Sequence, residues 1–257
     1  MVAHSSTNSN GSIWGRREGS TAAYRVKPAF YTLVVAPASE RAERPEARKC
    51  DKALLSLTDC ERALPANRTS SIAAVLHEKY DGQSWFSETQ SYLQVRVPAL
   101  EERMIASFRY VDVDQDNGRV FSYEFSSILN DACRAFGSSM DKIVRNDSSV
   151  PKKDDYDIWD YYDLLDGLFK KRFSRVSPVV FSVDLTRVSM SINHQKASGK
   201  CLMPFDSVVA KSTPMKWWSA HNRLKHSDID NAKEGNFQNA FNALAGLAFL
   251  MSQCLGY

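Results

Sequence analysis

The chain has 257 residues, of which 43% are hydrophobic and 25% charged, values that lie in the ordinary range of globular proteins. The length suits one domain of moderate size with an appendage, or two small domains. The net charge of +3 is too small to identify a nucleic acid or a membrane as a partner. The sequence contains no run of about 18 apolar residues, so it predicts no membrane-spanning helix.

The cysteines and the first residues of the chain indicate a compartment. The five cysteines are widely scattered, odd in number and without a CxxC pair, so they predict neither a disulfide framework nor a zinc site. Met1–Ser20 lacks the apolar centre of a secretory signal. We therefore expect a cytoplasmic protein, with no metal and no other cofactor.

Residues 1–97 carry weak structural signals. Residues 1–25 are typical of a flexible tail, and Phe30–Val35 predicts a short strand. Pro37–Ser71 is rich in Ala, Arg, Glu and Pro and is interpreted as a linker or weakly ordered segment. Ile72–Leu93 is expected to be helical in part. We therefore predict that residues 1–97 form an appendage that is partly disordered.

Residues 98–257 predict a mainly α domain, a helical bundle with a short β-strand or hairpin insertion. One helix is expected to start at Pro98, because proline is favoured in the first turn. The other predicted helices are Ser122–Val144, Asp154–Phe173, Thr213–His226 and Glu234–Cys254. The alternation within Pro178–Ile192 predicts a strand with a bulge, or a hairpin.

Two features of these helices predict packing. Gly137 lies inside the second helix, where it lowers helix stability by about 1 kcal/mol relative to alanine, so we expect another helix to pack closely there. The last helix is apolar over most of its circumference, which predicts a central place in the bundle.

The segment Asp112–Gly118 is similar to a calcium-binding loop. However, glycine stands at position 7 and Glu124 at position 13, where an EF-hand requires positions 6 and 12. A turn before a helix is the preferred interpretation.

The main concentration of reactive side chains lies in Trp217–His226. On a helix, Trp218, Asn222 and Lys225 share one face, and His226 follows one turn after Asn222. The wider stretch His194–His226 contains six basic residues and one acidic residue, a local charge of +5. Basic groups beside aromatic rings suit a single-stranded nucleic acid. The alternative is structural: tryptophans of an amphipathic helix usually belong to the core, and a C-terminal histidine often caps a helix.

A set of residues within about residues 98–257 forms a distinctive pattern: Tyr110, Asn117, Phe121–Phe125, Pro204-Phe205, Trp217-Trp218, Ala220, Asn222, Lys225-His226, Asn239 and Asn242–Ala245. In this pattern the C-terminal part of the chain resembles a group of prokaryotic proteins that we associate with the HEPN-like helical superfamily.

The resemblance implies a dimeric helical bundle, RNA as ligand and, in many members, metal-independent endoribonuclease activity in defence or toxin–antitoxin systems. Asn222 matches the polar residue of the family signature and His226 its histidine. His221 stands where the signature has arginine, and Arg223 is displaced by two positions. An imidazole is a poorer phosphate ligand than a guanidinium.

Three functional hypotheses follow. The first is a HEPN-like RNA-binding protein or ribonuclease, with His226, Asn222, Lys225 and His221 as catalytic residues. The nucleic-acid-binding residues expected beside them are Arg223, Lys216 and Trp218. The second is a non-catalytic helical interaction module, either an accessory protein of a defence system or a degenerate relative that binds a protein partner or a nucleotide. The third, ranked last, is a calcium-responsive protein built on Asp112–Glu124.

Overall fold

The computed structural model describes residues 13–15, 24–26, 31–35, 55–56, 76, 78–176, 185, 188–192, 201–208 and 214–255. The predictions for residues 1–12, for most of residues 37–71 and for Thr213 lie outside these ranges. The helices are α3 (Ser84–Ser107), η2 (Asp116–Arg119), α4 (Tyr123–Asn146), α5 (Ile158–Val176), α6 (Lys216–His226), η5 (Ala232–Glu234) and α7 (Phe237–Leu255). The strands are β1 (Ile13–Gly15), β2 (Tyr24–Val26), β3 (Tyr31–Val35), β4 (Leu55–Ser56), β5 (Val188–Ile192) and β6 (Cys201–Leu202).

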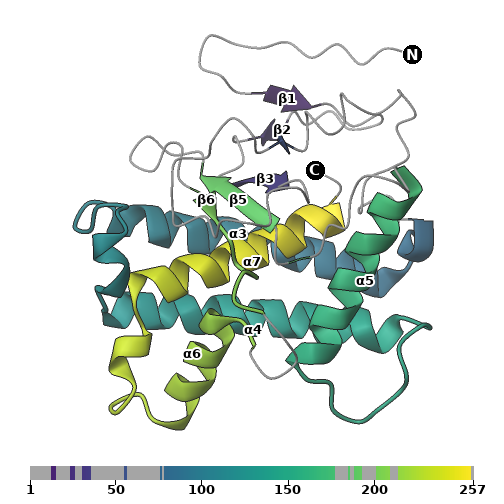
Figure 1. The fold of residues 1–257 in the computed structure, drawn as a ribbon. Coiled ribbons are helices and arrows are strands. Elements are labelled where there is room, and N and C mark those ends of the chain that lie inside the picture. Colours follow the sequence, from purple (N-terminus) through teal and green to yellow (C-terminus); the bar gives the residue numbers. More distant parts are fainter. Residues whose placement is uncertain are drawn as a thin grey trace.

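The described part of the chain is mainly helical, and α7 lies at its centre (Figure 1). Helix α7 packs against α3, α4 and α6, and most of its residues are buried. This agrees with its prediction as the central helix. Among the described helices, none is both long enough and apolar enough to cross a lipid bilayer.

Helix α3 runs through the predicted division between residues 97 and 98. The prediction that a helix starts at Pro98 is wrong, because Pro98 lies inside α3 and is exposed. Proline removes one backbone N–H from a helix interior. Leu93, Val97, Leu100 and Met104 form a buried stripe on both sides of Pro98, and their burial holds the helix together despite it. The helical body therefore begins before residue 98.

Helix α4 agrees closely with its prediction. The hydroxyl of Ser122 accepts a hydrogen bond from the backbone N–H of Phe125 at 3.1 Å and so caps the first turn. The buried stripe runs from Phe125 to Val144, and the helix ends at Asn146.

A buried polar cluster lies where α4 ends. Asp147 is fully buried and accepts hydrogen bonds from Lys79 Nζ at 2.6 Å, from Ser149 N at 2.7 Å and from the Tyr80 hydroxyl. Burial alone would raise the pKa of Asp147, but these donors outweigh it and lower the pKa to about 2. Burial and then Asp147 raise the pKa of Tyr80 above its ordinary value. These hydrogen bonds connect Lys79 and Tyr80, which precede α3, to the end of α4.

The other helix ends follow from local capping. Helix α5 begins at Ile158 rather than Asp154, because the Asp157 carboxylate accepts hydrogen bonds from Trp159 N and Asp160 N, at 2.8 and 3.2 Å, and so acts as the cap. Helix α6 ends at His226 as predicted, and Ser207 Oγ accepts from Lys216 N at its start.

Helix α7 begins at Phe237 rather than Glu234. The side chain of Asn236 accepts a hydrogen bond from Asn239 N at 2.9 Å and caps the helix. Glu234 belongs instead to the short helix η5.

Two tryptophan–glycine contacts seat α6 on the bundle. A Cβ added at Gly137 of α4 would lie 3.3 Å from the Trp218 ring, and one at Gly246 of α7 would lie 3.1 Å from the Trp217 ring. The indole N–H of Trp217 donates to the carbonyl oxygen of Pro204 at 2.7 Å. The close packing predicted at Gly137 is thus present.

The strands form a small antiparallel sheet in the order β4-β3-β5-β6 and a separate pair, β1-β2. The predicted strand at Phe30–Val35 is present as β3, which pairs with β5 in the register Leu33 to Met190. Of the strand or hairpin expected at Pro178–Ile192, the described residues contain Leu185 and β5. Met190 and Ile192 of β5 are buried, so this strand contributes to the core.

Candidate nucleic-acid interface

Helix α6 separates the predicted functional residues into two sets. Trp217, Ala220, His221 and Leu224 are buried, and their spacing forms one stripe that faces the bundle. The exposed set consists of Lys216, Asn222, Arg223, Lys225 and His226. Of the two histidines predicted among the catalytic residues, His226 is exposed and His221 lies on the inner side of the helix.

His221 is held between α6 and α4. It is 4% exposed, and its Nδ1 lies 2.8 Å from Oδ1 of Asn130. Because an amide oxygen only accepts, Nδ1 carries the proton. Burial and then the charges of Lys225 and Arg134 lower the pKa of His221 to about 4. At neutral pH His221 is an uncharged imidazole.

Arg223 is exposed, but its positive charge is balanced by the carboxylate of Glu234. Its Nε and one of its terminal nitrogens donate to the two carboxylate oxygens of Glu234, at 2.9 and 2.8 Å. Such a bidentate pair fixes the guanidinium and balances its charge. Arg223 therefore braces α6 against η5, and its charge is only partly available to another anion.

Lys225 and Arg134 are the cations that lie beside His221. Both are exposed, and neither forms an ion pair with any residue that the structure describes. Arg134 belongs to α4. Burial raises the pKa of the Cys133 thiol on the same helix, and the charge of Lys225 partly opposes this rise, so Lys225 also lies close to α4. Two positive charges, neither of them paired with an acid of the described residues, thus lie near His221, where α6 packs on α4.

The remaining predicted residues lie around this point. Asn222 and His226 are exposed one turn apart on α6. Trp218 is half-buried, with its ring 6.2 Å from Phe136 and 5.8 Å from His221 between centroids. Lys216 lies nine positions before Lys225, about 13 Å along the axis and on the opposite face of an ideal helix. The structure does not bring Lys216 together with the others.

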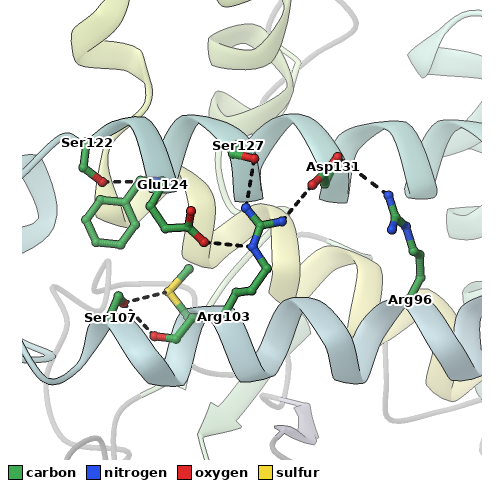
Figure 2. A network of polar contacts seen from close by, with 9 residues as sticks. Arg96, Arg103, Ser107, Ser122, Glu124, Ser127 and Asp131 are labelled. Carbon is green, nitrogen blue, oxygen red and sulfur yellow. Dashed lines mark hydrogen bonds and ion pairs between the residues drawn. The ribbon is translucent and has the colours of Figure 1, made fainter.

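Acidic side chains on the neighbouring flank of α4 are paired (Figure 2). Arg103 of α3 donates to Glu124 and to Asp131, each at 2.8 Å, and also to Ser127 at 2.9 Å. Arg96 reaches the other oxygen of Asp131 at 3.7 Å. These contacts join α3 to α4 and balance the carboxylates, so they leave the charge of Arg134 on the same helix uncancelled.

The turn Asp112–Gly118 forms local contacts. Asp114 Oδ1 accepts from Asp116 N at 3.1 Å, and the Asn117 amide donates to the carbonyl oxygen of Asp112 at 3.1 Å. Helix η2 follows, in agreement with the predicted turn. Within the described ranges, no three His, Cys, Asp or Glu side chains form a group that could hold a metal ion.

Asn130 and Arg134 were not predicted from the sequence. They precede α6 by about 90 residues, and no spacing rule connects them to it. The burial of His221 did have a signal, because positions 217, 220, 221 and 224 repeat the spacing of a buried helix face. Searches against protein-family models, curated proteins and solved structures return no match for this chain.

Proposed function

We propose that this chain is a HEPN-like RNA-binding protein whose phosphate contacts come from the crossing of α4 and α6. The observation that carries the proposal is the pair of exposed cations, Arg134 and Lys225, which lie beside the uncharged His221 and form no ion pair with a described residue. The resemblance of residues 98–257 to the HEPN-like group, with its expected helical bundle and hairpin insertion, supports RNA as the ligand.

The chemistry of the proposed contacts is that of a phosphate diester. Arg134 can donate two parallel hydrogen bonds to phosphate oxygens, and Lys225 supplies a point charge one helix away. Asn222 and His226 lie beside Lys225 on the exposed side of α6 and add further hydrogen-bonding groups. His221 receives a positioning role, because its proton is committed to Asn130.

The test of binding is fluorescence anisotropy with a labelled 12-nucleotide single-stranded RNA at 50 and 200 mM salt. The variant R134Q/K225Q is expected to bind about tenfold more weakly at 50 mM salt, with a salt slope smaller by about two. The matched control K142Q/K153Q removes two positive charges that are paired with Glu88 and Asp160, and is expected to bind within about twofold of the parent.

Two outcomes of this test contradict the proposal. A parent protein without RNA affinity at 50 mM salt removes it and favours the non-catalytic interaction module. Equal affinities of the parent and R134Q/K225Q place the phosphate contacts elsewhere.

Cleavage is a second candidate activity, favoured by the exposed His226 one turn after Asn222. In this reaction His226 takes the proton of the RNA 2′-hydroxyl, whose oxygen attacks the adjacent phosphorus. The bond from phosphorus to the 5′ oxygen then breaks, and that oxygen receives a proton from water or from the protonated imidazole. Lys225 stabilises the charge of the pentavalent phosphorane, and Asn222 orients the phosphate.

The test of cleavage compares the parent with H226A and H226Q on an end-labelled RNA in EDTA. Loss of cleavage in both variants, with RNA affinity kept within about threefold, supports His226 as the acid–base group. Cleavage by H226A at the parent rate removes the catalytic role, while the binding proposal stands.

A further inference from the structure

Exposed aromatic side chains lie at both ends of the connection between α3 and α4. Tyr123 is 90% exposed, Tyr110 is 87% exposed and Phe121 is 50% exposed. Tyr110 lies in the turn that follows α3, and Phe121 and Tyr123 lie at the other end of that connection. Large aromatic surfaces left in water at neighbouring positions are typical of a contact surface for a ligand.

The backbone that carries Phe121 and Tyr123 is fixed by contacts with the start of α7. Phe121 forms an antiparallel bridge with Asn236. Ser122 N donates to Gly235 O at 3.2 Å, and Phe237 N donates to Val120 O at 2.8 Å. Two aromatic rings are therefore presented from a backbone that is already ordered, which reduces the entropy lost on binding.

Tyr123, Asn130 and Arg134 lie along one line of α4. Their spacings of seven and eleven residues are close to two and three helical turns, so Asn130 and Arg134 each lie within about 20° of Tyr123, on opposite sides of it. Tyr123 is then about 16 Å along the axis from Arg134. A single strand with roughly 3.4 Å per stacked nucleotide covers this distance in about five nucleotides, within the site sizes of single-strand binders.

The charges along this line suit a strand whose phosphates lie at one end and whose bases lie at the other. Glu124 and Asp131 are paired with Arg103, as described above, so they do not oppose a polyanion. The exposed rings of Phe121 and Tyr123 give this end a flat apolar surface, and bases rather than phosphates are the part of RNA that stacks on it.

We infer that Phe121 and Tyr123 form a stacking platform for unpaired bases, and that the ligand of this chain is single-stranded rather than duplex RNA. The inference rests on the proposed function, since Arg134 and Lys225 hold the backbone of the same strand. Stacked bases on the platform and phosphates at the α4–α6 crossing are about five nucleotides apart. A duplex cannot place its bases on the platform, because they are already stacked within it.

The test uses the full chain and three labelled probes: a 12-nucleotide RNA, a duplex of the same length, and a 12-unit ribose-phosphate strand without bases. Y123A is expected to weaken binding of the single strand about tenfold, and F121A/Y123A more, with an unchanged salt slope. The parent is expected to bind the strand without bases as weakly as F121A/Y123A binds RNA. Y92A, which removes a 41% exposed tyrosine from α3, is the matched control and should bind within about twofold of the parent.

The outcomes separate this inference from the proposed function. If the parent binds RNA at 50 mM salt but Y123A binds it equally well, the platform is wrong and the phosphate contacts stand. Equal affinity for the duplex, or for the strand without bases, also overturns the platform. A parent without affinity for any probe overturns both. Y123A changes one fully exposed side chain, so its result remains interpretable if F121A/Y123A does not fold.

Discussion

Two polar clusters on α4, one at its end and one near its middle, differ in how their charges are balanced. At its C-terminal end, Asp147 is buried and receives hydrogen bonds from Lys79, Tyr80 and Ser149. Near its middle, Arg134 and Lys225 both lie close to His221, and neither forms an ion pair with a described residue. The first cluster is internally complete and stabilises the fold. The second leaves charge uncompensated at the surface, which adds nothing to folding and makes it the better candidate for a ligand.

The largest expected effect belongs to the buried cluster. Asp147→Ala leaves the Lys79 ammonium and the Tyr80 hydroxyl without their acceptor, so we expect a loss of about 3–5 kcal/mol in the free energy of unfolding. Urea denaturation measures this loss. Asp155→Ala, at an exposed aspartate, is the control and should change the free energy by less than about 0.5 kcal/mol. A loss below about 1 kcal/mol in Asp147→Ala would contradict the conclusion that this cluster stabilises the fold.

The second effect is a pH dependence due to His221. Its pKa is about 4 in the folded chain, against the ordinary histidine pKa of 6.5 expected in the unfolded chain, so the unfolded chain binds the proton more tightly. The contribution of His221 to stability is complete above pH 6.5 and is lost as the pH falls through about 4. At 1.36 kcal/mol per pKa unit it amounts to about 3 kcal/mol.

The measurement compares the parent with His221→Gln from pH 4 to pH 7. The advantage of the parent should grow with pH over this range, and a constant difference would contradict the buried, uncharged imidazole. Glu101 provides a control of opposite sign, because burial raises its pKa to about 7. Its contribution is complete below about pH 4.5 and is lost as the pH rises through 7, so Glu101→Gln should gain on the parent as the pH rises.

The smallest effect on stability is expected at the uncompensated cations. R134Q/K225Q should change the free energy of unfolding by less than about 0.5 kcal/mol, because no ion pair with a described residue is lost. The same variant should raise the pKa of His221, since two positive charges that oppose its protonation are removed. NMR titration of the imidazole resonances measures this shift. A marked loss of stability would assign the two cations to the fold rather than to a ligand.

Local signals predicted most of the helices but only part of the packing between them. Ser122 and the stripe after it predicted α4 almost to the residue, because capping and periodicity are local properties. Pro98 misled the prediction, since the burial of Leu93 and Val97 before it is visible only in the assembled bundle. The start of α5 was placed too early because three acidic residues directly precede it, and only hydrogen bonds identify Asp157 as the cap.

The candidate interface was predicted in part for the same reason. Asn222, Lys225 and His226 were expected to be exposed and are exposed. His221 was assigned to the same surface because its chemistry was weighed more heavily than its spacing. Arg134 and Asn130 could not be connected to α6, since their proximity arises from the packing of two helices far apart in the sequence.

The seating of α6 by two tryptophans on two glycines has a consequence for how the chain can vary. Trp217 and Trp218 fix the rotation of α6 by packing against Gly246 of α7 and Gly137 of α4. Both contacts lie on the inner side of α6, away from its outer surface. Substitutions at Asn222, Lys225 or His226 can therefore accumulate during divergence without disturbing the core. Replacing these outer residues with those of another binding helix would change the ligand specificity while the core stays the same. A bulkier residue at Gly137 or Gly246 would instead rotate α6 and so move all of its outer residues together.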